Sequence, residues 1–152
     1  MQATTPISRI MTRRPAVVKP SDTMEEVRKI FEKHGFHHVP VVSENKLVGL
    51  VSYTDYLSLI RAVFDNPQDD RTNEKVLHAL KVEEVMTKHL LCLNQTDTAE
   101  AALRIFKANQ FHSLPVVDEQ QHLVGIITTY DLMKVLEKVF MQYADAVEDP
   151  GR

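Results

Sequence analysis

The chain of 152 residues, 43% hydrophobic and 26% charged, has the composition of an ordinary globular protein. Its net charge of −3 provides no basic surface of the kind that nucleic acids and anionic membranes attract, and no apolar run is long enough to span a membrane. A single cysteine excludes an intrachain disulfide and, with no signal peptide at the start, indicates a cytoplasmic protein.

Two copies of one unit follow each other along the chain. An offset of 75 residues aligns the Met-Thr pair at 11–12 with that at 86–87, and FHHVPVV at 36–42 with FHSLPVV at 111–117. One additional residue near Gln121 then raises the offset to 76. Such a repeat indicates a duplicated structural unit. The divisions are repeat 1 (1–64), a linker with a short helix (65–81) and repeat 2 (82–152), which ends in an acidic tail.

Each copy is predicted to fold as strand, helix, strand, strand, helix. The result is an α/β protein of two β-α-β-β-α repeats packed about a pseudo-twofold axis. The first strands are expected at the short apolar runs 16–18 and 90–93. The next helix is expected to begin at Asp22-x-x-Glu25 in repeat 1 and at Asp97-x-x-Glu100 in repeat 2, a spacing typical of helix N-termini.

A hairpin is expected after this helix in each copy. Gly35 suits the left-handed residue that ends a helix, whereas its counterpart Gln110 does not. The polar turn 43–46 predicts an antiparallel pair of strands. These strands are expected at 39–42 and 47–51, and at 114–117 and 123–127. Because Pro40 and Pro115 lack an amide donor, we expect them at the start of a strand or on an edge strand.

The second helices are expected to begin near Thr54 and near Thr129-Tyr130. Between the repeats, the polar segment 65–73 predicts a linker and 73–81 a short helix. Both second helices carry more apolar side chains than one packed face requires. Packing within the pair of repeats explains this excess, and so does a homodimer surface on the same helices.

A repeated phrase occupies the junction between the last strand and the second helix: GLVSYTD at 49–55 and GIITTYD at 125–131. Its hydroxyl residue and aspartate have the spacing of a helix capping box, which explains both by stability alone. Capping does not explain the glycine, which is costly within a strand. The missing side chain leaves room for another backbone or for a flat ligand. The helix amides favour a phosphate there, and the aspartate is able to accept both hydrogen bonds of a ribose diol.

The duplicated unit, its Met-Thr opening, the Pro-Val-Val strand and the G-h-h-S/T-x-x-D phrase together resemble a tandem pair of CBS domains, the Bateman module. The resemblance covers roughly residues 7–64 and 82–143. It implies a non-enzymatic regulatory module whose cleft binds an adenine nucleotide (AMP, ADP or ATP) or, in some members, S-adenosylmethionine. The expected partners are therefore a nucleotide, an effector protein of unknown identity and, from the apolar second helices, a second copy of the chain.

The resemblance also implies which residues bind such a ligand. The aspartate contacts ribose and the hydroxyl residue contacts ribose or phosphate, roles that fall on Asp55 and Asp131, and on Ser52 and Thr128. The base lies between apolar residues of the first strand region and of the Pro-Val strand. With the neighbouring prolines and histidines, these residues are Ala16, Val17, His37, Val39, Pro40, Leu91, Cys92, His112, Leu114 and Pro115.

One departure from the family pattern concerns charge. Members that hold phosphate tightly often place arginine or lysine near the start of the Pro-Val strand, where this chain has His37-His38 and His112-Ser113. Neutral histidine supplies one hydrogen-bond donor and little charge, so phosphate affinity is expected to rise on acidification. Arg13, Arg14 and Lys88, which follow the two Met-Thr pairs, either supply the missing charge or are solvated surface residues.

Other kinds of chemistry have less support in the sequence. His34, His37 and His38 cluster, but no further ligand stands at zinc-binding spacing, so no metal site is expected. Cys92 lies in an apolar run and is expected to be a small buried residue. No catalytic motif is present, and we do not expect an enzyme. The alternative to ligand sensing is a structural or dimerisation module in which the two Ser/Thr-x-x-Asp boxes act only as caps.

Overall fold

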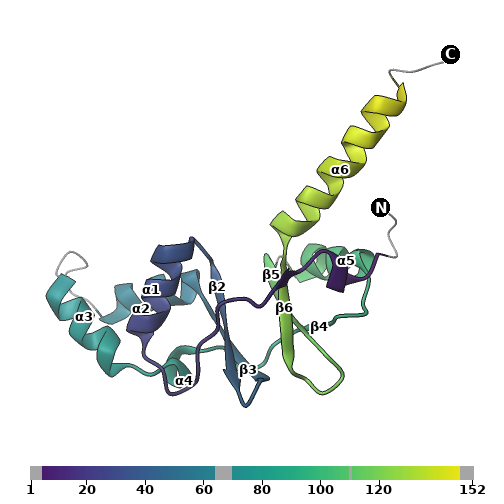
Figure 1. The fold of residues 1–152 in the computed structure, drawn as a ribbon. Coiled ribbons are helices and arrows are strands. Elements are labelled where there is room, and N and C mark those ends of the chain that lie inside the picture. Colours follow the sequence, from purple (N-terminus) through teal and green to yellow (C-terminus); the bar gives the residue numbers. More distant parts are fainter. Residues whose placement is uncertain (1–4, 64–69, 110, 148–152) are drawn as a thin grey trace. The chain divides into compact units, whose positions relative to one another are not determined.

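Both repeats contain the predicted helices and hairpin strands in the predicted order, while the first strand of repeat 1 is reduced to a single bridge. A computed structural model describes residues 5–63, 70–109 and 111–147 of the chain. Its elements, labelled as in Figure 1, are η1 (Ile7–Arg9), β1 (Thr12–Arg13), α1 (Met24–His34), β2 (His38–Ser43), β3 (Lys46–Ser52), α2 (Tyr53–Val63), α3 (Asp70–Ala79), α4 (Val82–Val85), β4 (Leu93–Asn94), α5 (Ala99–Asn109), β5 (Ser113–Val117), β6 (Leu123–Thr128) and α6 (Thr129–Val147). The predicted α/β class is therefore confirmed.

The chain forms two compact units whose limits differ from those of the repeats. The repeat 1 unit consists of residues 15–91 with 120–123, and contains the β2-β3 hairpin with α1 to α4. The repeat 2 unit consists of the chain up to Arg14, residues 92–119 and the chain from Val124 on, with the sheet order β1-β6-β5-β4. Each unit thus includes a segment that the sequence assigns to the other repeat.

In the repeat 2 unit the exchanged segment is the beginning of the chain. The amide of Ile7 donates to the carbonyl of Asp97 at 2.8 Å, just before α5. β1 then pairs antiparallel with β6, so that Thr12 lies opposite Ile126 and Arg13 opposite Gly125. The first Met-Thr pair therefore completes the second repeat.

In the repeat 1 unit the exchanged segment surrounds α4. The amide of Val82 donates to the carbonyl of Asp22 at 2.9 Å, just before α1. Thr87 and Leu50 exchange two backbone hydrogen bonds of 2.9 and 3.0 Å, which joins the second Met-Thr pair to β3. The two units are therefore completed in the same way.

Each unit has its own hydrophobic core. The buried cluster of the repeat 1 unit comprises Val18, Met24, Val27, Phe31, Val39, Val41, Val51, Leu77 and Val82. That of the repeat 2 unit comprises Ile7, Met11, Leu93, Ala102, Phe106, Leu114, Val116, Ile127 and Leu132. Each large apolar side chain that is buried in this way contributes about 1.5–3 kcal/mol. Because Ile7, Met11, Leu77 and Val82 belong to these clusters, the exchanged segments are part of the cores.

The two junction glycines accommodate the exchanged Met-Thr pairs. A Cβ at Gly49 would collide with the Sδ atom of Met86. A Cβ at Gly125 would lie 2.6 Å from the Sδ atom of Met11 and 2.8 Å from the carbonyl oxygen of Thr12. Of the two explanations that the sequence left open for these glycines, close approach of another chain segment is confirmed. The space beside each glycine is filled by methionine and is not open to a flat ligand.

The predicted strand at 16–18 is reduced to a single bridge, and a proline explains why. The amide of Val18 donates to the carbonyl of Pro40 at 3.1 Å, and the carbonyl of Val18 accepts from Val42 at 2.9 Å. The next bond of this parallel ladder would run from the amide of residue 40 to the carbonyl of Ala16. Proline has no N–H, so the ladder stops at Val18. Pro40 lies on an edge strand, as predicted.

The predicted strand at 90–93 is likewise shortened to Leu93 and Asn94. The parallel register pairs Leu93 with Val116, which places Pro115 where extension of β4 toward Leu91 would need a donor. Pro115 nevertheless lies in the middle of β5, an interior strand between β6 and β4. The expectation of a strand start or an edge position is therefore wrong for Pro115. The structure tolerates this proline because β4 ends before it requires the missing N–H.

Both first helices begin one residue later than predicted. Thr23 is the N-cap of α1, and its amide donates to Glu26 at 2.9 Å. Thr98 has the same place before α5, where its hydroxyl accepts a hydrogen bond of 3.2 Å from the third residue beyond it. Asp22 and Asp97 instead accept 2.7 Å hydrogen bonds from amides three residues earlier, which closes the preceding turn. These aspartates are therefore unavailable as caps.

The turns and helix ends agree with local sequence. Glu44 and Asn45, with φ of 49° and 67°, form the tight left-handed turn between β2 and β3. Gly35 ends α1 with φ of 62°, as predicted, while Gln110 lies outside the described residues. Gln121, the additional residue of the second copy, has φ of 66°, and its carbonyl accepts from Leu47 at 3.3 Å. The insertion thus forms a turn that joins the repeat 1 unit.

The segments that connect and end the repeats are more helical than predicted. α3 begins at Asp70, within the expected linker, while 64–69 lie outside the described residues. α6 continues to Val147, so the first residues of the acidic tail are helical and 148–152 lie outside the described residues. None of the helices in the described ranges is long and apolar enough to cross a membrane.

Candidate functional site

The repeated phrase forms a reciprocal set of hydrogen bonds at the start of each second helix. The amide and hydroxyl of Ser52 donate to Oδ2 of Asp55 at 3.0 and 2.6 Å, and the amide of Asp55 donates to the Ser52 hydroxyl at 3.0 Å. The corresponding distances are 2.9, 2.8 and 3.2 Å for Thr128 and Asp131. Both boxes therefore cap their helices, as their spacing predicts.

A second backbone contact brings the Pro-Val strand to each junction. The amide of Tyr53, the first residue of α2, donates to the carbonyl of His37 at 2.8 Å. The amide of Thr129, the first residue of α6, donates to the carbonyl of His112 at 3.0 Å. Each contact satisfies an amide that the first turn of a helix leaves unpaired. The start of the Pro-Val strand and the aspartate are therefore close together in both repeats.

The two aspartates differ in what remains free after capping. Asp131 is 6% exposed, and its Oδ1 lies 3.2 Å from Nζ of Lys134, which also lies over the ring of Tyr130. Asp55 is half-buried, and within the described part of the chain only its Oδ2 receives a hydrogen bond. The residue that corresponds to Lys134 is Ser58. One carboxylate oxygen is therefore open to a ligand at the first junction and held by a lysine at the second.

The apolar candidates divide into core and surface residues. Val39 and Leu114 are 0% and 2% exposed and belong to the two cores, so their side chains offer no surface to a base. Their role in binding a base therefore stays a prediction that burial of their side chains does not favour. Val17 and Leu91, at 41% and 46%, are exposed. Cys92 is half-buried, and burial raises the pKa of its thiol, which disfavours a reactive thiolate.

The remaining apolar candidates lie where the short ladders end. Pro40 and Pro115 are buried, and Ala16 is half-buried. Because the ladder beside Pro40 stops at Val18, no described backbone amide donates to the carbonyl of Ala16. A carbonyl acceptor and an exposed valine side chain thus lie side by side in the sequence, at Ala16 and Val17.

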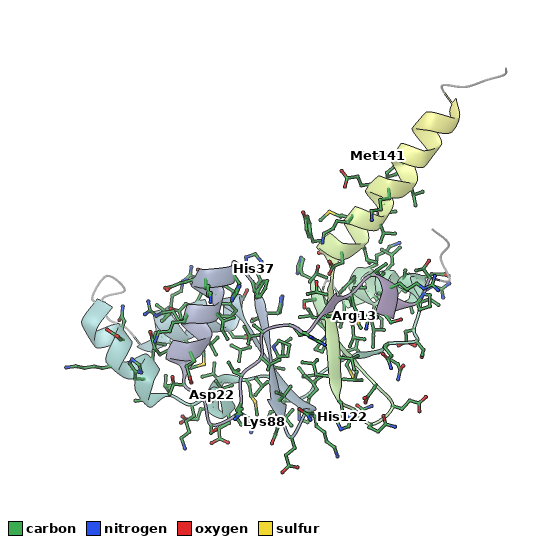
Figure 2. The ribbon with its side chains drawn as sticks, viewed as in Figure 1. Arg13, Asp22, His37, Lys88, His122 and Met141 are labelled. Carbon is green, nitrogen blue, oxygen red and sulfur yellow. The ribbon has the colours of Figure 1, made fainter. Side chains whose placement is uncertain are left out.

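The basic residues serve the repeat opposite to the one that contains them. Arg13 lies opposite Gly125 in the repeat 2 unit, and its Nη2 donates to the carbonyl of Ser8 at 2.7 Å (Figure 2). Lys88 follows Thr87, which pairs with β3, so Lys88 belongs to the repeat 1 unit. Sequence alone could not assign them in this way, because the exchange of the Met-Thr segments is a long-range feature.

Ser113 is a residue that the sequence analysis did not select as a site. It is 6% exposed at the start of β5, and its hydroxyl has no hydrogen-bond partner among the described residues. An unpaired buried hydroxyl costs about 1–3 kcal/mol. The feature of the sequence that could have identified Ser113 is a serine in an otherwise apolar strand. It follows His112, whose carbonyl accepts a hydrogen bond from the first amide of α6.

One group of potential metal ligands that includes a histidine occurs among the described residues. The group that comes closest to metal-ligand geometry is Glu25, Glu74 and His78, with ligand atoms within 4.8 Å of one another. Both oxygens of Glu25 are already bound by Arg28, at 2.7 and 2.8 Å, and Lys29 lies 3.7 Å away. Two neighbouring cations disfavour a further positive ion there.

Known proteins match this sequence along both repeats. The model of the CBS domain family matches residues 7–62 and 82–138. The uncharacterised protein MJ1225 of Methanocaldococcus jannaschii is 30% identical over 82% of this chain and 44% of its own length. Inosine-5'-monophosphate dehydrogenase of the same organism is 32% identical over 88% of this chain and 24% of its own length. The chain thus spans less than half of these curated relatives.

Solved structures match the fold. MJ1225 superposes with a TM-score of 0.77 at 29% identity, over 90% of this chain and 49% of that protein. The CBS-pair protein CBSX2 of Arabidopsis thaliana superposes with a TM-score of 0.76 at 26% identity, over 90% and 96% of the two chains. CBSX2 in complex with AMP gives 0.73 at 26% identity, over 88% and 97%. With two matches of the family model and this fold, the chain belongs to the CBS domain family, as a tandem CBS pair.

Proposed function

We propose that this chain is a non-enzymatic regulatory module that binds an adenine nucleotide at the strand-to-helix junctions of its repeats. The observation that carries the proposal is the free carboxylate oxygen of Asp55, which remains after the other oxygen has capped α2. A similar CBS pair, CBSX2, has been solved in complex with AMP. That likeness supports an adenine nucleotide as the class of ligand.

At the first junction the ligand groups would meet residues of one compact unit. Oδ1 of Asp55 accepts a ribose hydroxyl, and the carbonyl of Ala16 accepts the exocyclic amine of adenine. The exposed side chain of Val17 covers one face of the base. Lys88 supplies positive charge for phosphate. Because Lys88 is the one basic residue of this set, we propose AMP as the preferred ligand, ahead of ADP and ATP.

At the second junction the same groups are present in a different balance. Thr128 and Asp131 take the place of Ser52 and Asp55, and the unpaired hydroxyl of Ser113 offers a further hydrogen bond. Lys134 holds the oxygen of Asp131 that would otherwise accept a ribose hydroxyl. We therefore propose that the second junction binds the nucleotide more weakly than the first. Arg13 and Lys134 would attract the phosphate of the nucleotide there.

Calorimetry on the full chain with AMP, ATP and S-adenosylmethionine tests this function. Asp55→Asn keeps an acceptor for the cap, so stability should change by less than about 0.5 kcal/mol. Losing the charged acceptor should weaken AMP binding roughly tenfold or more. Glu44→Gln, an equal change in the exposed β2-β3 turn, is the matched control. No heat with any of the three ligands, or unchanged affinity in both Asp55→Asn and Asp131→Asn, would leave the boxes as caps only.

A second function, self-association, is favoured by the surface of α6. Tyr130, Met133, Leu136 and Phe140 are between 47% and 69% exposed and fall on one stripe of the helix. Burial of such a stripe against a second copy would account for it. Light scattering should report a dimer that Phe140→Glu converts to a monomer, while Lys138→Glu, outside the stripe, has no effect. A monomeric wild-type chain would refute this role.

A further inference from the structure

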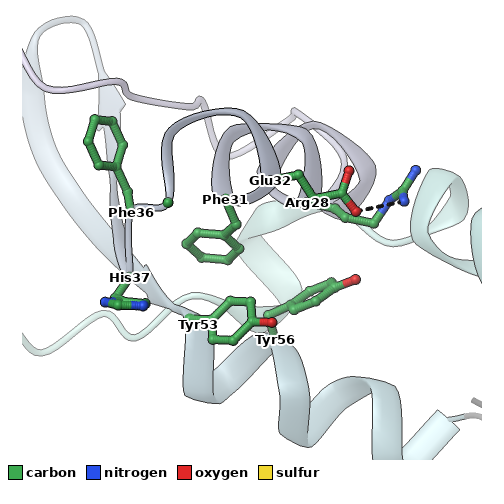
Figure 3. Close-up of a pocket in the computed structure, with 8 residues that line it drawn as sticks. Arg28, Phe31, Glu32, Phe36, His37, Tyr53 and Tyr56 are labelled. Atoms are coloured by element: carbon green, nitrogen blue, oxygen red, sulfur yellow. Dashed lines mark hydrogen bonds and ion pairs between the residues drawn. The ribbon is translucent and has the colours of Figure 1, made fainter.

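A cavity of about 320 Å³ opens beside the first junction, within the repeat 1 unit (Figure 3). The last turns of α1, the residues that follow it and the first turn of α2 line this cavity. Its walls are largely aromatic, from Phe31, Phe36, His37, Tyr53 and Tyr56. The capping residues Ser52 and Asp55 do not line it, and of the candidate nucleotide-binding residues it includes only His37.

The aromatic rings of the cavity contact one another at angles that range from 31° between Tyr53 and Tyr56 to nearly perpendicular. The rings of Phe31 and Tyr53 are 5.3 Å apart at 88° to each other, and those of His37 and Tyr53 are 6.0 Å apart at 54°. Phe31 is buried in the core at 5% exposure, whereas Tyr53 and Phe36 remain 37% and 41% exposed. A rigid wall is therefore combined with rings that are accessible to a ligand.

The ion pairs at one end of the cavity leave no free cationic group that could bind an anion. The guanidinium of Arg28 donates to both oxygens of Glu25, at 2.7 and 2.8 Å, and to Glu32 at 3.0 Å. Glu25 and Glu32 together balance the charges of Arg28 and Lys29, so this end carries no excess charge, and the carboxylate of Glu32, whose side chain is 61% exposed, lies at the rim. Lys29 approaches Glu25 at 3.7 Å and does not line the cavity. Arg28 is thus fully engaged by carboxylates and is not available to bind an anion.

The second repeat provides an internal comparison. It keeps the aromatic residues that correspond to Phe31, Phe36 and His37, namely Phe106, Phe111 and His112. The other five lining positions differ: Arg28, Glu32, Gly35, Tyr53 and Tyr56 correspond to Leu103, Lys107, Gln110, Thr129 and Leu132. The fold therefore does not require the two tyrosines or the ion pair, which distinguish the cavity of repeat 1.

We propose that this cavity binds a small organic cation with an alkylated ammonium group, of the quaternary ammonium class. Aromatic faces attract such a cation within about 6 Å of the ring centre, and an alkylated ammonium loses little hydration on entering an apolar box. The carboxylate of Glu32 adds a charge of the right sign at the rim. The volume lies at the lower end of the roughly 300–1,000 Å³ of small-molecule sites, which suits a compact head group.

Choline and its neutral carbon isostere, 3,3-dimethylbutan-1-ol, test the proposal by NMR titration of the full chain without nucleotide. Binding of choline should reach saturation and should shift the ring signals of Tyr53, Tyr56 and His37. The ring signals of His112 should stay unchanged. The isostere, equal in shape, should bind at least about fivefold more weakly, because it lacks the cation–π attraction.

Variants taken from the second repeat keep the test independent of folding. Tyr53→Thr and Glu32→Lys introduce residues that repeat 2 already carries at these positions, and each should weaken choline binding about fivefold or more. Lys107→Glu, the reverse change in repeat 2, should leave choline binding unchanged. Equal affinity for the isostere, no saturation with choline, or full binding by both variants would overturn the proposal. Because nucleotide is absent, none of these results depends on the junctions.

Discussion

The helices beside the two junctions have diverged more than the junctions themselves. In α1, Glu25 is 1% exposed and accepts hydrogen bonds from Nε and Nη2 of Arg28. In α5 its counterpart Glu100 is exposed and pairs with Arg104 at 2.6 Å on the surface. The capping boxes, in contrast, have the same hydrogen bonds within a few tenths of an ångström. The two repeats therefore share the geometry of the capping boxes at the proposed nucleotide sites, and they differ in the ion pairs of α1 and α5.

The largest difference between the repeats should appear when these glutamates are removed. Glu25→Ala leaves a partly buried guanidinium with only Glu32, and should cost about 2–3 kcal/mol of unfolding free energy. Glu100→Ala removes an exposed i,i+4 pair and should cost about 0.3–0.5 kcal/mol. Urea denaturation measures both values. Equal costs would show that the buried pair in α1 is no more important than the surface pair in α5.

For the junction glycines, the larger loss of stability is expected in repeat 2, at Gly125. A Cβ at Gly125 meets the backbone carbonyl of Thr12 as well as Met11, so Gly125→Ala should cost about 1–2 kcal/mol through overpacking. A Cβ at Gly49 meets only the side chain of Met86, which is able to rotate away, so Gly49→Ala should cost less than about 1 kcal/mol. Thermal unfolding compares the two. A greater loss in Gly49→Ala would contradict the role assigned to the Thr12 backbone.

Exchanging Ser58 and Lys134, which lie three residues after Asp55 and Asp131, should reduce the difference in AMP affinity between the two junctions. Lys134→Ser frees an oxygen of Asp131 and should strengthen AMP binding at the second junction a few-fold, while Ser58→Lys should weaken it at the first. Because Asp131 is buried and Lys134 is half-exposed, Lys134→Ser should cost no more than about 1 kcal/mol of unfolding free energy. Calorimetry of both variants and of the double exchange provides the measurement. Shifts of the same sign in both single variants would argue against competition for the aspartate.

A smaller effect is expected from pH. The hydrogen bond from Arg28 holds the pKa of Glu25 below its ordinary value of 4.5 in the folded protein. Stability from this shift is therefore complete above the unfolded pKa and is lost as the pH falls through the lower folded pKa. The difference in unfolding free energy between the wild type and Glu25→Gln should shrink as the pH falls below about 4.3. A constant difference from neutral pH down to acid would show that the charge of Glu25 is unimportant.

Features that depend on neighbouring residues could be predicted from the sequence. The capping boxes, the left-handed end at Gly35 and the β2-β3 turn each arise within a few residues, so the composition of a short segment is sufficient. The same local reasoning placed the caps of α1 and α5 one residue early, at Asp22 and Asp97. Each of these aspartates has two local amide partners within reach, and spacing alone does not choose between them.

Candidate site residues were predictable only where their position follows from the junction. Ser52, Asp55, Thr128 and Asp131 form the capping boxes that their spacing predicts, and their role in binding stays a prediction. Val39 and Leu114 are core residues, since the strand face to which a side chain belongs depends on the sheet. The aromatic cavity was not predicted, because Arg28 and Tyr53 come from separate helices whose packing brings them together.

The sequence by itself determined that the chain is a duplicated CBS unit, the order of its elements and the caps at both junctions. Repetition and capping are written in residue types at short spacing, and they need no knowledge of distant contacts. Only the tertiary structure decided that each Met-Thr segment completes the opposite repeat and that methionine fills the space beside Gly49 and Gly125. These outcomes depend on which buried surfaces meet, and contacts between residues far apart in the chain leave no periodic signal in it.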